Sequence, residues 1–179
     1  MKAVLKWLGW VLAGAVVIHV LAVWLAPSII MAIAISRMEE RAGAPNTLFH
    51  APRITEDARE VVRPAPDLAY SVCTYDVSSG PVRLVLPKTQ TYSSVSMFDD
   101  TTDNFFALND RDVTGAAQEV WVTAVDAEAA VAPENVIVVT APTDRGMVLF
   151  RRVIPSNDAW PRIDAERRQA VCEPLQSAS

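Results

Sequence analysis

The densest group of side chains that could bind a ligand lies between residues 99 and 112. It holds five aspartates and two asparagines: Asp99, Asp100, Asp103, Asn104, Asn109, Asp110 and Asp112. Carboxylate and amide oxygens are the ligands of Ca²⁺, which takes about six to eight of them. The segment has neither the glycine nor the closing glutamate of an EF-hand loop. The alternative is a set of turns in which Asp and Asn side chains accept hydrogen bonds from their own backbone. We favour the turns and predict no metal site.

Residues for nucleophilic catalysis are few. The chain has two histidines, and only His50 lies outside the apolar N-terminal segment. There is no G-x-S-x-G elbow, so a serine or cysteine nucleophile has no evident basic partner in the sequence. Paired histidines, C-x-x-C motifs and glycine-rich phosphate loops are also absent from the sequence. We therefore predict no catalytic residue and no cofactor, and we favour a protein that is not an enzyme.

The two cysteines, Cys73 and Cys172, could form a disulfide bond. An even pair in an exported domain predicts a disulfide, because oxidising compartments allow the bond to persist. Closing a loop of about 100 residues stabilises a fold by about 4–5 kcal/mol in the chain-entropy argument. The alternative is two buried thiols that lie too far apart to join.

An apolar run, Trp7–Ile35, precedes all of these residues and contains no Asp, Glu, Lys or Arg. A helix needs about 20 apolar residues to cross the hydrocarbon of a membrane, so the run can cross once. Pro27 marks a kink or the end of the span. Lys2 and Lys6 precede the run, which predicts a cytoplasmic N-terminus, a periplasmic C-terminal domain and insertion in the bacterial inner membrane. A cleaved signal peptide and a buried core helix are the alternatives.

The remaining chain predicts short strands separated by turns rich in Pro, Gly, Asp and Ser. A net charge of −5 without a basic patch argues against a nucleic-acid partner. Alternating or β-branched segments predict the following strands: Leu68–Tyr75, Val82–Leu86, Tyr92–Phe98, Phe105–Leu108, Gln118–Thr123, Asn135–Thr140 and Met147–Val153. Asn135–Thr140 is apolar on both faces, which predicts a central strand. This spacing predicts a mainly β fold, an antiparallel jelly-roll-like sandwich.

One helix is predicted near the C-terminus. Asp158 can cap it, Pro161 suits its first turn, and Ile163–Val171 continues it. Cys172 follows directly, so a bridge to Cys73 would fasten this helix to the sheet. The predicted division of the chain is 1–41 for the membrane helix and its extension, 42–66 for a Pro-rich linker, and 67–179 for the sandwich. A short helical turn is expected near Thr55–Glu60.

Several ordered blocks of sequence resemble a known family. They are Arg63–Ser71, Tyr75-Asp76, Gly80–Arg83, Asp103–Phe106, Asn109–Arg111 and Pro142–Gly146. Together they are similar to the domain-of-unknown-function 1254 family, in its short bacterial form with one N-terminal membrane helix. The resemblance covers about residues 52 to 173. It implies a cell-envelope protein with a β-rich domain and no assigned activity.

Polar residues within these blocks are candidate site residues, and the resemblance implies a partner. One interpretation of its polar residues is a pocket for an anionic or sugar-like ligand, and the alternative is a set of Arg–Asp pairs that tie loops together. The candidate ligand-binding residues are Arg63, Asp67, Asp103, Asn104, Asp144 and Arg145. The family's domain often accompanies the domain of unknown function 1214, which this chain is too short to include. A separate companion protein that carries it is therefore the expected partner, besides the lipid bilayer around Trp7–Ile35.

Two hypotheses for function follow. The first is a single-span membrane protein whose periplasmic sandwich binds or assembles with the companion. The second is a hydrolase-like subunit whose active site the companion completes. A deep pocket around Asp67, Asp103 or Arg145 would favour the second hypothesis, and a flat apolar patch would favour the first.

Overall fold

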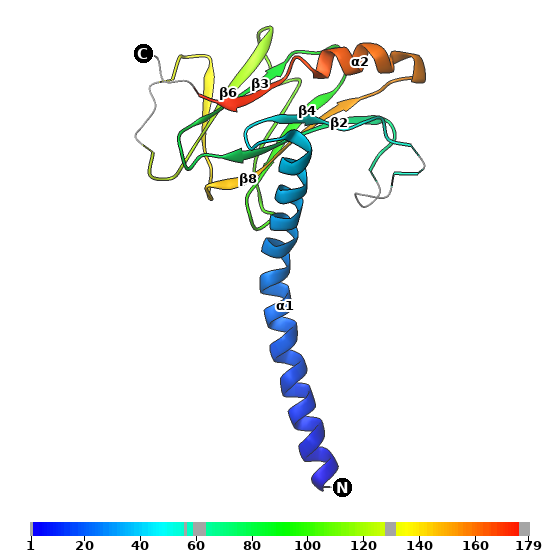
Figure 1. Cartoon of the computed structure of the whole chain (residues 1–179), viewed down its shortest axis with the longest axis vertical. Coiled ribbons are helices and arrows are strands. Elements are labelled where there is room, and N and C mark those ends of the chain that lie inside the picture. The colour runs from blue at the N-terminus through cyan, green and yellow to red at the C-terminus, as the bar shows by residue number, and fades with distance from the viewer. Residues whose placement is uncertain (1, 56, 59–63, 128–131, 176–179) are drawn as a thin grey trace.

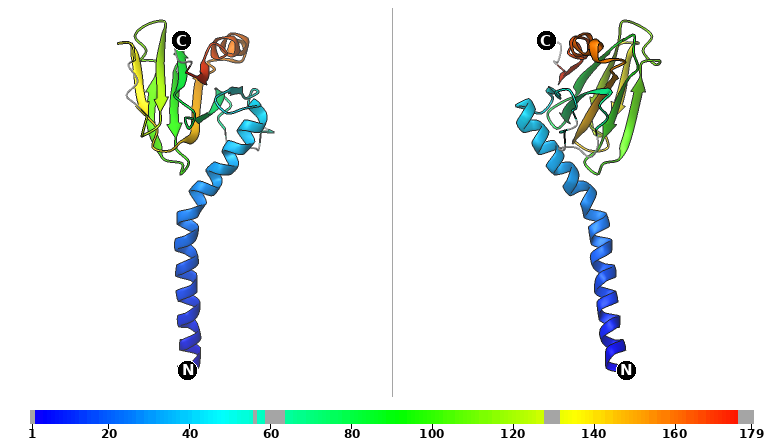
Figure 2. Two further views of the ribbon diagram at one scale, coloured as in Figure 1. Left: turned by 60° about the vertical axis from the view of Figure 1, so that its left-hand side comes forward. Right: turned by 90° about the vertical axis from the view of Figure 1, so that its right-hand side faces the viewer.

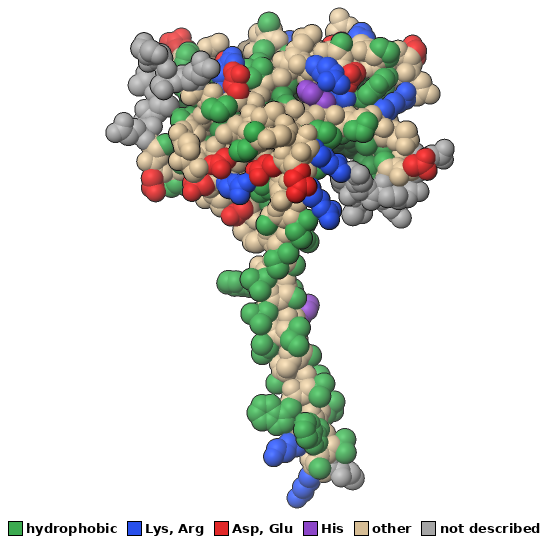
Figure 3. All heavy atoms as spheres, in the orientation of Figure 1, with side chains coloured by type: hydrophobic (Ala, Val, Ile, Leu, Met, Phe, Trp, Pro, Cys, Tyr) green, Lys and Arg blue, Asp and Glu red, His purple; other side chains and the backbone are tan. Residues whose placement is uncertain are grey.

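The computed structural model describes residues 2–55, 57–58, 64–127 and 132–175. A long N-terminal helix forms a stalk, and nine strands and a short helix form a head at its C-terminal end (Figure 1). Hydrophobic side chains cover the stalk, whereas charged side chains are spread over the head (Figure 3).

The stalk is a single helix, α1 (Lys2–Ala42), of 41 residues. It is long and apolar enough to cross a membrane, and its most apolar window is almost entirely exposed, which contradicts a buried core helix. Pro27 lies inside the helix and removes one backbone donor, a change that kinks or breaks a helix. Both views in Figure 2 show a bend partway along α1. Of the two outcomes predicted for Pro27, the kink is therefore the one observed.

The last turns of α1 belong to the head. Met31 and Ile35 are only 6% and 5% exposed, because α1 packs there against strands β1 (Leu48–His50), β2 (Leu68–Asp76) and β8 (Arg145–Val153). The predicted membrane run thus ends inside the folded domain. Part of the predicted linker is also in a sheet, since β1 pairs with β2. Of the helical turn expected near Thr55–Glu60 the structure describes residues 55, 57 and 58, and there the Ala58 amide donates to the Thr55 carbonyl at 3.0 Å.

One sheet has five strands in the order β1-β2-β8-β4-β5, which adds β4 (Ser93–Phe98) and β5 (Asn104–Asn109) to the three strands above. Every neighbouring pair in it is antiparallel. The nine-residue strands β2 and β8 are paired along their whole length, from Leu68 opposite Val153 to Asp76 opposite Arg145. They form the centre of the sheet on which α1 rests.

The other sheet has four strands in the order β7-β6-β3-β9. They are β7 (Val136–Thr140), β6 (Ala117–Thr123), β3 (Val82–Pro87) and β9 (Val171–Pro174). β7 runs parallel to β6 and lies at the edge, so the prediction of a central strand at 135–140 was wrong. An apolar sequence shows that a strand has side chains suited to burial, but it does not show where the strand lies in its sheet. In β7 one of these apolar side chains, Val138, is 43% exposed.

The core lies between the two sheets and is built from alternate residues of the strands. Large side chains such as Tyr75, Leu84 and Met97 are fully buried in it. Inward positions repeat every second residue, as expected for strands that are half-buried. The predicted mainly β sandwich is confirmed, with one parallel pair, β6 and β7, in an otherwise antiparallel arrangement.

The C-terminal helix α2 (Trp160–Arg167) is shorter than predicted and follows a single 3₁₀ turn, η1 (Asn157–Ala159). Ala159, and not Asp158, occupies the N-cap position, and no side chain caps it. Pro161 lies in the first turn as predicted. The helix ends at Arg167, and four residues later Val171 pairs with Val85 of β3. Val171 begins β9, a strand that the sequence pattern did not predict.

The disulfide joins the two sheets and not a helix to a sheet. Cys73 lies in β2 and Cys172 in β9, with 6.5 Å between their Cα atoms. Both side chains are buried in the core between the sheets. The expectation that the bond fastens the C-terminal helix is therefore corrected, since Cys172 is a strand residue.

Candidate functional site

The predicted ligand-binding residues lie at two ends of the sandwich. The loop with Asp103 and Asn104 adjoins the loop with Asp144 and Arg145, because the Asp100 amide donates to the Thr143 hydroxyl at 3.3 Å. Asp67 precedes β2 at the other end, where its carbonyl accepts from the Ile154 amide at 2.7 Å. Arg63 lies outside the described residues. The structure therefore brings four of the six residues to one end and does not gather the set around one cavity.

Arg145 has partners within the protein. Its guanidinium contacts the Glu39 carboxylate of α1 at 2.6 Å and the Asp76 carboxylate of β2 at 3.6 Å. The Asn104 side-chain amide donates to the Met97 carbonyl at 3.1 Å. These contacts tie α1 and the loops to the five-stranded sheet. They agree with the structural alternative for these residues, and the prediction that they bind a ligand stays untested.

The acidic segment forms turns of the kind expected from its composition. One Asp99 oxygen accepts from the Thr101 amide at 2.8 Å and from the Asp103 amide at 2.9 Å. The Asp112 carboxylate accepts from the Asn109 amide, also at 2.9 Å. Because these oxygens bind their own backbone, they are not arranged around a cation, and the part of the chain that the structure describes holds no cluster with metal-ligand geometry.

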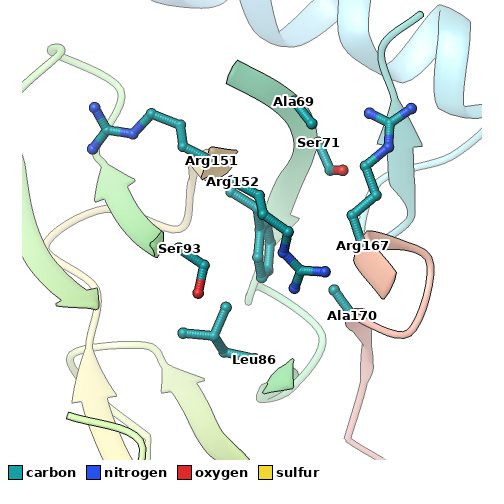
Figure 4. A pocket seen from close by; sticks show the side chains of 9 residues that line it. Ala69, Ser71, Leu86, Ser93, Arg151, Arg152, Arg167 and Ala170 are labelled. Carbon is teal, nitrogen blue, oxygen red and sulfur yellow. The ribbon is translucent and has the colours of Figure 1, made fainter. Parts of the chain in front are cut away.

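A different site emerges where α2 approaches the sheets. A cavity of about 10 Å³ lies there, close to the volume that one buried water occupies. Strands of both sheets and the α2–β9 turn contribute to it (Figure 4). Its lining residues are Ala69, Ser71, Leu86, Ser93, Phe150, Arg151, Arg152, Arg167 and Ala170.

The position of Arg152 follows from the alternation of β8. Gly146, Val148, Phe150 and Arg152 all face inward, so a cation occupies a position at which the strand pattern otherwise has apolar residues. Its cross-strand neighbours are Ala69 on β2 and Ser93 on β4. Both neighbours are small, and this leaves space beside the guanidinium, which points into the cavity (Figure 4).

Arg152 is buried without a complete set of partners. The residue is 4% exposed, and its Nη1 atom makes no hydrogen bond. The nearest carboxylate oxygen, Glu166 Oε2, lies 3.8 Å away and also has no hydrogen-bond partner. The other Glu166 oxygen accepts from Arg162 at 2.7 Å. Burial lowers the pKa of Arg152, against which Glu166 raises it, but a guanidinium stays protonated in proteins.

Arg167 is the second buried cation, and it is fully engaged. Its guanidinium donates to the Asp164 carboxylate at 2.7 Å and to the Tyr70 carbonyl at 2.6 Å. It also lies over the Trp160 ring, 5.0 Å from the centroid. These contacts fasten α2 to β2, so Arg167 forms a wall of the cavity and Arg152 is the cation with unused capacity.

A histidine and a serine meet beside this cavity. His50 Nδ1 lies 2.8 Å from the Ser71 hydroxyl oxygen, because the two residues are directly opposite on β1 and β2. Burial lowers the pKa of His50, and the nearby Arg167 and Arg168 lower it further. The imidazole is therefore neutral at pH 7. Ser71 is only 2% exposed, so the pair is closed to a substrate in this conformation.

The sequence pattern reveals neither feature directly. His50 falls in the predicted linker 42–66, because a three-residue strand is too short to show a period. Arg152 did carry a signal, since it falls in phase with the inward-facing Val148 and Phe150. A charged residue at such a position predicts a buried polar site.

The fold and site define a β-sandwich on an apolar helical stalk, with a cationic cavity beneath its short helix. The matching protein family is DUF1254, described as "Protein of unknown function", over residues 45–174. The chain belongs to this family. No curated protein matches it.

Two solved structures share the fold. The VPA0106 protein from Vibrio parahaemolyticus matches with a TM-score of 0.54 and 15% identity, over 64% of this chain and 32% of its own. An uncharacterised protein from Burkholderia cenocepacia matches with a TM-score of 0.51 and 16% identity, over 87% of this chain and 42% of its own. The matched part thus spans less than half of either relative, and identities this low show the fold alone.

Proposed function

We propose that this protein is a single-span inner-membrane protein whose periplasmic sandwich binds a companion envelope protein, one that carries the domain of unknown function 1214. The observation that carries the binding role is the apolar edge strand β7. The family's frequent association with that second domain gives the partner its identity.

The stalk supports the membrane part of the proposal. The α1 residues before the buried Met31 are almost all exposed and uncharged apart from Lys2 and Lys6. About 29 residues at 1.5 Å each give about 43 Å of helix, more than the roughly 30 Å hydrocarbon layer. The two lysines lie at the N-terminal end, which favours a cytoplasmic N-terminus. Because α1 continues into the head without a linker, the sandwich would stand directly on the membrane surface.

The disulfide supports export. A bond between Cys73 and Cys172 persists in oxidising compartments and is rare in the reducing cytoplasm. With the N-terminus inside, one crossing puts the sandwich and its disulfide in the periplasm.

The β7 edge supports the binding role. Its sequence, VIVVT, is apolar and β-branched, and among the described strands β7 has only β6 as a neighbour. Val138 is 43% exposed, and Val125, in the segment after β6, is 64% exposed. Edge strands with such composition pair readily with other chains unless they are covered, so natural proteins protect them. A companion that adds a strand or an apolar surface here would bury these valines.

Affinity purification of the full chain from detergent, with mass spectrometry of the bound proteins, tests the proposal. We expect a stoichiometric companion with the wild type and loss of that companion in Val138→Lys, which puts a charge on the edge. Ala107→Lys is the matched control, because Ala107 is exposed on β5, the edge strand of the other sheet. A chain that purifies alone, or a companion that remains with Val138→Lys, would refute binding at this edge.

The hydrolase-like subunit is the second candidate, and the His50–Ser71 hydrogen bond is the observation in its favour. A neutral imidazole beside a hydroxyl is the arrangement that activates a serine nucleophile. Since Ser71 is buried, the companion would have to open the site. Labelling by a fluorophosphonate probe in the presence of the companion, lost in Ser71→Ala, would support this function. Absence of labelling in the assembled complex would exclude it.

A further inference from the structure

The cavity beneath α2 offers three polar groups to one small volume. They are the Arg152 guanidinium and the hydroxyls of Ser71 and Ser93. The remaining lining residues are Arg151, Arg167, Ala69, Leu86, Phe150 and Ala170. Binding of a companion at the β7 edge does not require such a group of donors in the interior, so the proposed function does not account for them.

The cation is not neutralised at hydrogen-bond distance. Among the described residues Arg152 forms an ion pair only with Glu166, at 3.8 Å, and Glu166 makes its shorter contact, 2.7 Å, with Arg162. Asp164 is engaged by Arg167 and Arg168. From residue 151 to residue 170 the sequence holds five arginines and three acidic residues, so the surroundings are cationic. A buried charge without a close partner is costly, which favours a bound counter-ion.

The donors suit an anion. In the neutral tautomer that carries its proton on Nδ1, His50 donates to the Ser71 oxygen, and the serine proton is then free to point into the cavity. The Ser93 hydroxyl makes one long contact, 3.4 Å from Thr89 Oγ1, in which Ser93 is the acceptor. Ser93 therefore also keeps its proton for a ligand. Arg152 Nη1 adds a charged donor that has no other hydrogen bond.

The volume limits the ligand. About 10 Å³ admits one group of the size of a water molecule, so phosphate and sulfate are too large. We infer that this cavity binds a small monatomic anion, chloride, through Arg152, Ser71 and Ser93. A neutral water would fill the same space but would leave Glu166, at 3.8 Å, as the nearest negative charge to the guanidinium.

Thermal unfolding of the full chain in a neutral detergent tests the inference at constant ionic strength. Sodium gluconate, whose anion is too bulky for the cavity, is replaced stepwise by sodium chloride or, for comparison with a polyatomic anion, by sodium formate. With chloride we expect a saturable rise of the unfolding midpoint of about 3 °C, as for a ligand that binds only the folded state. A response to chloride alone supports the inference, and an equal or stronger response to formate would contradict it.

Variants locate the effect. Arg152→Gln should abolish the anion-dependent shift, and Arg111→Gln should keep it, because Arg111 is exposed in the loop after β5 and does not line the cavity. If Arg152→Gln does not fold, Ser93→Ala gives a smaller change and should weaken the response. Crystals of the wild type soaked in bromide should show an anomalous peak within hydrogen-bond distance of Arg152. Equal midpoints in all three salts, a shift that survives in Arg152→Gln, or no peak would overturn the inference.

Discussion

The two sheets of this sandwich differ in what they bury. In the five-stranded sheet, buried polar residues are Ser71, Thr74, Ser93, Ser94, Ser96 and Arg152. In the described part of the four-stranded sheet they are Gln118 and Thr123. Both helices pack against strands of the five-stranded sheet, whereas the four-stranded sheet ends in the apolar edge strand β7. The five-stranded sheet is thus supported by both helices and holds an internal polar site, and we call it the supported sheet. The four-stranded sheet presents a surface that a partner can cover.

The disulfide is the covalent link between these unlike sheets, and breaking it should have the largest effect. In the Cys73→Ser/Cys172→Ser double variant, we expect the free energy of unfolding to fall by about 4–5 kcal/mol, because the closed loop spans 99 residues. Denaturant titration measures the loss, and reduced wild type should behave like the variant. A loss below about 1 kcal/mol would mean that the packed core alone holds the sheets together.

Close packing within the five-stranded sheet depends on Gly146. A Cβ atom there would come within 2.6 Å of the Tyr75 ring and closer still to the Phe98 carbonyl. We expect Gly146→Ala to reduce the free energy of unfolding by about 2–3 kcal/mol, since neither backbone nor a buried ring can yield easily. Gly115→Ala is the control, because its nearest atom would be 3.8 Å away. Equal stability of the two variants in denaturant titrations would contradict the packing described for this sheet.

Ionisation of the same tyrosine, Tyr75, should lower the stability of the supported sheet at high pH. Burial raises the pKa of Tyr75 to about 12, above its ordinary value of 10.0. Because the Tyr75 pKa is higher in the folded protein than in the unfolded chain, the contribution of Tyr75 to stability is fully present below pH 10. It is lost as the pH rises from 10 to 12, because the unfolded chain ionises first. The loss should reach about 2–3 kcal/mol. Unfolding curves at pH 9, 10, 11 and 12 measure it. Tyr75→Phe should flatten the profile, and an unchanged profile in that variant would assign the effect to another group.

Ion pairs on the two sheets should contribute least. Arg145 pairs with Glu39 on the supported sheet, and Arg83 pairs with Glu119 at 2.9 Å on the other. All four side chains are partly exposed, so each coupling energy should be below about 1 kcal/mol. Double-mutant cycles with Arg145→Gln and Glu39→Gln, and with Arg83→Gln and Glu119→Gln, measure the two couplings. A coupling of several kcal/mol at Arg145 would make the α1 contact a major determinant of the fold.

Sequence pattern predicted most of the strands because alternation reports directly which side chains are buried. Seven of the nine strands lie where it expected them. It could not find β1, which is three residues long, or β9, whose four residues follow a helix closely. Sequence pattern does not report the order of strands in a sheet either, and this is why the apolar β7 was expected at the centre.

The candidate site was harder to predict, because its members come together only through sheet pairing. Ser71 and Ser93 lie on strands that flank β8, and their spacing in the sequence carries no motif. Arg152 alone had a local signal, a charge in phase with the core. The polar loops that drew attention in the sequence instead bind their own backbone, as the Asp99 side chain does.

Photo-crosslinking at position 138 in living cells tests the central claim most directly, because it reports which protein contacts the β7 edge in the cell envelope. A photoreactive residue in place of Val138 should yield one discrete adduct with an envelope protein, and the same residue at Ala107 should yield none. An adduct with the companion at position 138 would establish this edge as the assembly surface. No adduct at 138, or the same adduct at both positions, would contradict the proposed role.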